Sequence, residues 1–349
     1  MKTQHPYLLH DESLNEAVRS LVAKAGKSEN SDLLIQMITT ALKLQGEKVD
    51  RGDLKILNSS LKELRWAFRV FAPYRHIPKV TVFGSARTKR TDPVFKVARD
   101  FSKLMVESGW MIITGGSTGI MHAGNEGAGR AHSFGANIKL PIEQGVNPVI
   151  RDDKKLIHFK YFFTRKLVFV KESDALCLFP GGFGTLDEGF EAFTLLQTGK
   201  MMPRPVVLLE PAGGTYWRRW LAFVKGSLLG KRRIDSADLH LFQMARTPEQ
   251  ARDVILDFYR NYHSMRFVGD RLVIRLKHPL RDSEVKQLNR QFGDIVTKGK
   301  IEPSKPLAVE SNDAASLTLP RLVLHFDRHS FGRLKCMVDA INCMGNQGA

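Results

Sequence analysis

The chain has 349 residues, of which 43% are hydrophobic and 26% are charged. These proportions are typical of globular proteins and exclude collagen-like, fibrous and wholly disordered chains. No apolar run reaches the ~18 residues of a membrane-spanning helix, and the N-terminus lacks the basic segment and apolar core of a secretory signal. The three cysteines form no Cys-x-x-Cys pair, so neither a disulfide framework nor a zinc knuckle is encoded. We therefore expect a cytoplasmic protein.

The formal net charge is +17 at pH 7. Residues 1–76 carry 12 basic against 9 acidic side chains, residues 77–262 carry 27 against 18, and residues 263–349 carry 14 against 9. The positive charge is thus spread along the chain and is not confined to a tail. It predicts an anionic partner, which could be nucleic acid, a nucleotide or an acidic surface.

Residues 1–76 are expected to form a helical extension. Apolar side chains recur at helical spacing in three successive stretches, and the second begins after a break at residues 26–31. The positions are Leu14, Val18, Leu21 and Val22, then Leu33, Ile35, Ile38 and Leu42, then Leu57, Leu61, Leu64 and Phe68. The third stretch ends before Pro73 and Pro78, because proline interrupts a helix.

A different pattern begins at Lys79 and continues to residue 262. Five short apolar runs alternate with segments of helical periodicity, and the runs end at or near glycine or proline; they are residues 80–83, 111–114, 137–140, 175–179 and 206–209. The alternation predicts an α/β fold, a doubly wound, Rossmann-like parallel sheet with helices on both faces. Right-handed crossovers place the strand ends along one edge, where open α/β sheets bind ligands.

Residues 263–349 change again and predict a small α+β appendage. The expected strands are residues 272–276 and 322–326, and the expected helices are residues 283–292 and 330–341. The segment 298–318 between them is polar and turn-rich. The sequence therefore predicts three parts: a helical extension (1–76), a nucleotide-binding catalytic domain (77–262) and an appendage (263–349).

Three glycine-rich turns follow three of the expected strands, at residues 84–87, 115–119 and 181–184. Glycine lets backbone N–H groups approach a ligand closely, and the positive end of a following helix favours phosphate. A single such turn is equally consistent with a tight strand-to-helix connection, but three on one sheet edge favour a phosphate site. None of the turns matches Gly-x-Gly-x-x-Gly, which argues against a dinucleotide site. None matches Gly-x-x-x-x-Gly-Lys-Ser/Thr, which argues against a nucleoside-triphosphatase P-loop.

The most specific segment runs from Pro180 to Glu188 and reads Pro-Gly-Gly-Phe-Gly-Thr-Leu-Asp-Glu. Thr185 and Glu188 have the spacing of a capping box, in which both side chains would only satisfy the first turn of a helix. The alternative is functional. A carboxylate beside a phosphate-sized turn repels the anion, but the arrangement is reasonable if a sugar lies between the two.

Residues 79–262 resemble the LONELY GUY family of nucleoside-monophosphate phosphoribohydrolases, whose members were often labelled lysine decarboxylase-like. The segment from Pro180 to Glu188 matches the signature Pro-Gly-Gly-x-Gly-Thr-x-x-Glu at every fixed position. Arg165-Lys166 matches an Arg-Lys pair on the preceding helix, and residues 115–121 match a glycine-rich run that ends in Gly-Ile-Met. The extensions at both ends resemble those of a longer bacterial branch, and molybdenum-cofactor carriers share a related fold.

The resemblance implies hydrolysis of the N-glycosidic bond of a nucleoside 5′-monophosphate such as AMP, which yields a free base and ribose 5-phosphate. It implies that Arg165 and Glu188 are catalytic. A carboxylate can stabilise the positive charge that develops on the ribose or activate the attacking water. Arg165 stays charged, so it would clamp phosphate or steer the ribose and Glu188. Without the family, Arg165 is better explained as a surface ion pair on a basic helix.

The expected substrate-binding residues are Gly84, Ser85, Arg87, Gly115, Gly116, Ser117, Gly119, Met121, Asn137, Lys166, Gly181, Gly182, Gly184 and Thr185. In the longer branch Glu143 would also lie near the substrate. Family members assemble through helices that flank the site, so a homodimer or larger homo-oligomer is implied. No cofactor, metal or membrane partner is expected, and the 11 histidines show no metal-ligand spacing.

Two departures from the family pattern bear on the substrate. Ser117 replaces the third glycine of the usual run, and its hydroxyl can still bind phosphate. Phe162-Phe163 replaces the Met-His of the cytokinin-activating plant members, which argues against a cytokinin nucleotide. The decarboxylase label is disfavoured as well, because pyridoxal phosphate needs a Schiff-base lysine and Lys166 already belongs to the Arg-Lys pair.

Two other functions compete with the hydrolase. A non-enzymatic binder or carrier of a nucleotide or phosphorylated cofactor would bind without turnover, although such a protein gains nothing from the Glu188 carboxylate. Nucleic-acid binding would follow from the charge and would weaken steeply with salt. Nucleic acid is disfavoured as a partner, because no recognised motif supports it and the basic residues lack interleaved aromatic side chains.

Overall fold

A computed structural model describes residues 8–26, 28–139, 145–310 and 313–344. Its contacts divide the chain into two units, Met1–Lys62 and Glu63–Ala349. The first unit holds α1 (Glu12–Ala25), α2 (Ser31–Gly46) and the part of α3 (Arg51–Phe71) that precedes Glu63. The Asp11 carboxylate accepts the backbone N–H of Ser13 and caps α1. The helices predicted for this part of the chain are confirmed.

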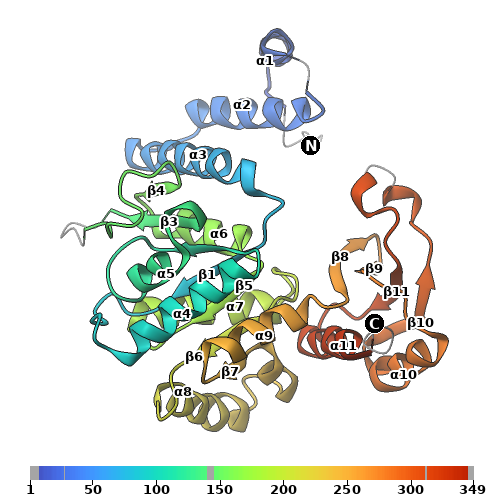
Figure 1. Ribbon diagram of the computed structural model, residues 1–349. Coiled ribbons are helices and arrows are strands. Elements are labelled where there is room, and N and C mark those ends of the chain that lie inside the picture. The colour runs from blue at the N-terminus through green and yellow to red at the C-terminus, as the bar shows by residue number, and fades with distance from the viewer. Residues whose placement is uncertain (1–7, 27, 140–144, 311–312, 345–349) are drawn as a thin grey trace. The chain divides into compact units, whose positions relative to one another are not determined.

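The second unit contains a seven-stranded sheet whose strand pairs are all parallel (Figure 1). Its order is β4-β3-β2-β1-β5-β6-β7. The strands are β1 (Lys79–Phe83), β2 (Met111–Thr114), β3 (Ser133–Ile138), β4 (Leu156–Phe159), β5 (Ala175–Leu178), β6 (Val206–Leu209) and β7 (Gln243–Ala245). The order reverses between β1 and β5, so this is the predicted doubly wound α/β fold.

Helices cover both faces of this sheet. One face packs against α4 (Pro93–Glu107), α5 (Ile120–Ala128) and α9 (Pro248–Phe258). The other packs against the C-terminal part of α3, α6 (Phe162–Glu172), α7 (Phe183–Gln197) and α8 (Tyr216–Phe223). The strands are buried on both sides, as in β5, where Ala175 and Cys177 belong to one core and Leu176 and Leu178 to the other.

The prediction of five strands was incomplete. The structure adds the edge strands β4 and β7, and it places β3 at Ser133–Ile138, whereas the sequence indicated residues 137–140. Residue 140 lies outside the described residues. The small residues Gly135 and Ala136 in β3 are buried but do not form a recognisable apolar run.

A second, antiparallel sheet follows, with the order β10-β11-β9-β8. Its strands are β8 (Tyr262–Val268), β9 (Arg271–Leu276), β10 (Val296–Ser304) and β11 (Arg321–Phe326), and its helices are α10 (Asp282–Phe292) and α11 (Phe331–Met344). The expected turn-rich segment 298–318 therefore begins within a strand. The ring of Phe331 packs where a Cβ on Gly199 would lie, just after α7, which fixes α11 to the larger sheet. Among the described residues, no helix is both long and apolar enough to cross a membrane.

Candidate functional site

The three predicted glycine turns meet at the carboxyl ends of β1, β2 and β5. The Ser85 N–H donates to the carbonyl of Pro180 at 3.3 Å, and the Ile120 N–H donates to the carbonyl of Ser85 at 3.0 Å. The Thr118 hydroxyl also donates to the carbonyl of Ala86 at 2.8 Å. These bonds tie the β1 turn to both of the others, and a cavity of about 1070 Å³ lies where they meet.

Two glycines are required by this close packing. Gly119 has φ +62°, and a Cβ there would lie 2.2 Å from the carbonyl oxygen of Ser85. A Cβ on Gly181 would lie 2.1 Å from the Thr185 hydroxyl. A side chain at Gly119 would push the turns after β1 and β2 apart, and one at Gly181 would displace Thr185.

Most of the predicted site residues line this one cavity. They are Gly84, Ser85, Arg87, Gly115, Met121, Arg165, Gly181, Gly182, Gly184, Thr185 and Glu188. The residues that do not line it are Gly116, Ser117, Gly119, Asn137 and Lys166. Glu143 lies outside the described residues.

Several of the residues that do not line the cavity contact the segments that form it. The Asn137 amide donates to the carbonyl of Gly115 at 3.2 Å, and the Gly116 N–H donates to the Thr114 hydroxyl at 2.9 Å. Lys166 forms ion pairs with two carboxylates of α7, at 2.7 Å and 3.2 Å. The buried Ser117 hydroxyl has no hydrogen-bond partner in the part of the chain that the structure describes.

Arg165 on α6 and Glu188 on α7 face each other inside the cavity. An Arg165 terminal nitrogen lies 3.3 Å from Glu188 Oε1, and Glu188 is only 8% exposed. Burial raises the pKa of Glu188 to about 7, although the neighbouring Arg165 acts in the opposite direction. The guanidinium lies over the rings of Phe162 and Phe169, at 4.9 Å and 5.5 Å from their centroids.

The sequence left two purely structural explanations open, a capping box for Thr185 and Glu188 and a surface ion pair for Arg165, and both are wrong. Helix α7 begins at Phe183 with Gly182 at its N-cap and no side-chain cap, so Thr185 and Glu188 do not form a capping box. The glycines allow the helix to start before Thr185, and this places Glu188 on the buried face. Arg165 is not a surface residue either, because its side chain is 14% exposed.

Sequence reasoning missed three residues at the site. Phe169 and Tyr216 line the cavity, and the Tyr216 hydroxyl donates to the carbonyl of Gly181 at 2.8 Å. Because Tyr216 follows the carboxyl end of β6, its place at this edge of the sheet could have been predicted from the sequence. Glu63 on α3 accepts the Lys160 N–H at 2.9 Å and the Thr164 hydroxyl at 2.6 Å. It thereby holds the start of the helix that carries Arg165, and no sequence signal indicated this.

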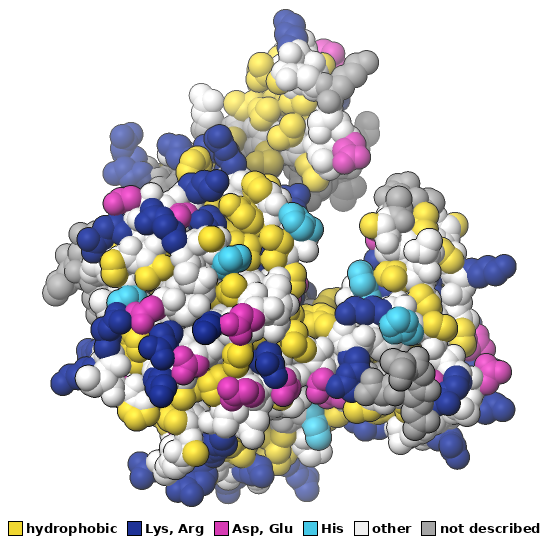
Figure 2. Space-filling view, in the orientation of Figure 1, with side chains coloured by type: hydrophobic (Ala, Val, Ile, Leu, Met, Phe, Trp, Pro, Cys, Tyr) yellow, Lys and Arg dark blue, Asp and Glu magenta, His cyan; other side chains and the backbone are white. Residues whose placement is uncertain are grey.

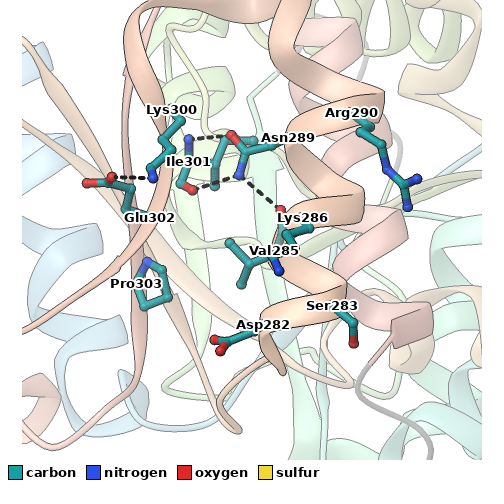
Figure 3. A pocket seen from close by; sticks show the side chains of 10 residues that line it. All are labelled: Asp282, Ser283, Val285, Lys286, Asn289, Arg290, Lys300, Ile301, Glu302 and Pro303. Carbon is teal, nitrogen blue, oxygen red and sulfur yellow. Dashed lines mark hydrogen bonds and ion pairs between the residues drawn. The ribbon is translucent and has the colours of Figure 1, made fainter.

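A second hollow, of about 830 Å³, lies between α10 and β10 (Figure 3). The Asn289 amide pairs with both the N–H and the carbonyl of Ile301, each at 2.8 Å. It thus satisfies backbone groups of β10 at the edge of the small sheet. None of the predicted site residues lies in this hollow. Among the described residues, no group of three or more His, Cys, Asp or Glu side chains could hold a metal ion.

Comparisons with known proteins agree with the motif. A family model described as "Possible lysine decarboxylase" matches residues 116–255. A probable cytokinin riboside 5′-monophosphate phosphoribohydrolase from Oryza sativa is 25% identical over 175 residues, which is 49% of this chain and 68% of that protein. One from Arabidopsis thaliana is 33% identical over 116 residues (33% and 55%). The Mycobacterium tuberculosis enzyme of that name is 28% identical over 137 residues (38% and 71%).

Solved structures that are similar to part of this chain include two molybdenum-cofactor proteins. The molybdenum cofactor binding protein of Rippkaea orientalis is 22% identical with a TM-score of 0.38, over 52% of this chain and 96% of that one. The molybdenum cofactor carrier protein of Chlamydomonas reinhardtii is 22% identical with a TM-score of 0.37, over the same shares. The family model over residues 116–255 and the curated relatives agree with the resemblance of the turn from Pro180 to Glu188 to the LONELY GUY family.

Proposed function

We propose that the chain hydrolyses the N-glycosidic bond of a nucleoside 5′-monophosphate and releases the free base and ribose 5-phosphate. The observation that carries this proposal is the buried Glu188 carboxyl, held 3.3 Å from Arg165 in a cavity built from three glycine turns. The names of the curated relatives, all phosphoribohydrolases, support the same class of reaction.

The phosphate would bind where the turns meet. The N-termini of α5 and α7 follow two of these turns, and the positive ends of their helix dipoles favour an anion. The Arg87 guanidinium lines the cavity and has no ion pair among the described residues, so it is available to a phosphate. The orphaned Ser117 hydroxyl behind the second turn is a further donor.

The ribose would then lie between the phosphate and Glu188. Breaking the bond between C1′ and the base nitrogen leaves positive charge on the ribose ring, which a carboxylate stabilises. A water adds its hydroxyl to C1′ and passes its proton to Glu188, and the departing base nitrogen takes a proton from solvent. Glu188 then releases its proton to solvent, which restores the carboxylate. Arg165 keeps its charge throughout and orients the carboxylate.

We also propose that the substrate is a nucleotide such as AMP. We further propose that the protein forms a homo-oligomer. Phe162, Phe163 and Phe183 are 51%, 54% and 93% exposed, and they lie on the two helices that carry Arg165 and Glu188. Exposed aromatic side chains of this size support a protein contact beside the site.

The direct test incubates the purified protein with a panel of ribonucleoside monophosphates and measures free base by chromatography. Base release from at least one of them is expected. Glu188→Gln should reduce turnover by roughly a thousandfold, because it removes the charge and the proton acceptor. Glu107→Gln is the control with the same chemical change, since Glu107 is exposed at the end of α4 and does not line the cavity, and it should retain most activity. A wild-type protein inert towards the whole panel, yet binding nucleotide, would instead indicate a carrier.

A further inference from the structure

One segment beside the larger sheet carries only positive charge. Residues 211–234, which follow β6, contain six lysines and arginines and no aspartate or glutamate. All six are exposed, on α8, on the two short helical turns that follow it and just beyond them. They are Arg218, Arg219, Lys225, Lys231, Arg232 and Arg233, and we call them the α8 patch. Figure 2 shows Lys and Arg side chains on the surface around the place where Figure 1 labels α8.

The chain does not neutralise these charges. None of the six cations forms an ion pair with a described residue, and Arg233 donates only to a backbone carbonyl, at 3.3 Å. The flanking carboxylates are engaged elsewhere, because Glu210 binds Arg246 at 2.7 Å and Asp235 caps the short helix that follows it. Other exposed arginines, such as Arg130, do pair with a carboxylate. Clustered cations without counter-charges repel one another, so an anion with several charges would stabilise this surface.

The apolar face of α8 already belongs to the protein core. Trp217 is buried, and the ring of Trp220 packs against the rings of Phe190 and Phe193. A helix that binds a membrane surface inserts its apolar face among the lipids, and α8 keeps that face inside the protein. An anionic membrane is therefore not the partner that this surface fits.

One aromatic ring lies within the patch. Phe223 is 51% exposed and lies four residues after Arg219 on the same helix, so the two side chains are neighbours on its surface. The sequence disfavoured nucleic acid because its basic residues lacked interleaved aromatic side chains, and this surface is the exception. The bases of a single strand stack on such rings, whereas the bases of a duplex are already stacked on one another. The ring therefore favours a single strand.

We propose that the α8 patch binds single-stranded nucleic acid, with its lysines and arginines on the phosphates and Phe223 against a base. The surface is separate from the proposed reaction, because none of its six cations lines the cavity. It begins beside the cavity, since Tyr216 lines the cavity and is the first residue of α8. Residues 77–262 carry 27 basic and 18 acidic side chains, a net charge of +9, and the six cations account for most of that excess.

The test titrates a short fluorescein-labelled oligouridine with the full chain and follows its anisotropy at increasing KCl. If four to six phosphates are contacted, log affinity against log salt should have a slope of about −3 to −4. Arg218→Gln/Arg219→Gln should weaken binding by about tenfold or more and make the slope shallower by about 1.4, since each contact contributes about 0.7. Lys96→Gln/Lys103→Gln removes the same charge from exposed positions of α4, on the opposite face of the sheet, and should bind nearly as tightly as the wild type.

A further variant tests the aromatic contact. Phe223→Ala should weaken binding of the single strand by about fivefold or more and leave binding of a duplex of the same length nearly unchanged. Equal losses with both would overturn the preference for single strands. Glu188→Gln should bind the oligonucleotide as the wild type does, so this proposal and the proposed hydrolysis can fail separately.

Four results would overturn the proposal. The first is a wild-type protein that does not bind the oligonucleotide at low salt. The second is an equal loss of affinity in the α4 and α8 variants, since binding would then follow net charge alone. The third is displacement of the oligonucleotide by excess AMP, which would place the strand in the cavity. The fourth is binding to phosphatidylserine vesicles without binding to the oligonucleotide, which would identify an anionic membrane as the partner.

Discussion

The protonation of Glu188 offers the most sensitive test of the site. Its pKa lies at about 7, raised from 4.5 because the carboxyl is buried. If the ionised carboxylate is the active form, kcat/KM should rise with pH through an apparent pKa near 7. It should fall about tenfold for each pH unit below that value. Released base, measured between pH 5 and pH 8, gives this profile directly.

The attraction of Arg165 sets the direction of a second measurement. Its guanidinium lies 3.3 Å from Glu188 and favours the charged form. In Arg165→Gln this attraction is lost while burial remains, so the pKa of Glu188 should rise further and the profile should move to higher pH. A flat profile between pH 5 and pH 8, or a shift to lower pH in the variant, would refute the assignment.

The same pKa predicts an effect on stability that does not require a substrate. Because the pKa of Glu188 is higher in the folded state than in the unfolded state, folding favours the neutral carboxyl. The free-energy cost of ionising the buried carboxyl is absent below pH 4.5, grows as the pH rises, and is complete above pH 7. At about 1.4 kcal/mol per pKa unit, it reaches about 3 kcal/mol. Glu188→Gln should therefore raise the free energy of unfolding by up to that amount at pH 8, and by almost nothing at pH 4.

Two further substitutions test how the site is held. Glu63→Ala removes both contacts to the start of α6, so turnover should fall about tenfold with little change in KM. Glu63→Gln can still accept a hydrogen bond and should recover part of the lost turnover. An unchanged kcat and pH profile in Glu63→Ala would show that Glu63 does not position Arg165. Gly119→Ala and Gly129→Ala both place a side chain at positive φ, but only the first meets the carbonyl of Ser85, while the second has open space. Thermal unfolding should show that Gly119→Ala is the more destabilising by at least ~1–2 kcal/mol, and equal effects would argue against the close packing of the turns.

The interior of the larger sheet could be predicted from the sequence because its strands are buried on both faces. Runs such as residues 175–179 and 206–209 are continuously apolar and end at or near proline. The strands that were missed, β4, β7, β8 and β10, are the edges of the two sheets. An edge strand pairs on one side only and tolerates polar side chains, as Gln243 and His263 show, so its residues do not form an apolar run.

Only the parts of the site that lie within sequence motifs could be predicted. The glycine turns identified the edge of the sheet where the cavity lies, and the signature from Pro180 singled out Glu188. Its partner could not be derived from spacing, because Arg165 lies 23 residues earlier on another helix. Glu63 is 101 residues from Thr164, whose hydroxyl it accepts. Such contacts depend on tertiary packing, which a single sequence does not encode in any local pattern.

The cost of burying Glu188 bears on the choice between a hydrolase and a carrier. A carboxylate close to a phosphate-binding turn weakens anion binding, and its burial costs stability at neutral pH. A protein that only carries a nucleotide would bind more tightly with a neutral residue of the same shape there. A carboxyl whose pKa lies near 7 is instead matched to proton transfer at physiological pH, where it is present in both forms. The penalty therefore supports the proposed hydrolase over a carrier that only binds a nucleotide.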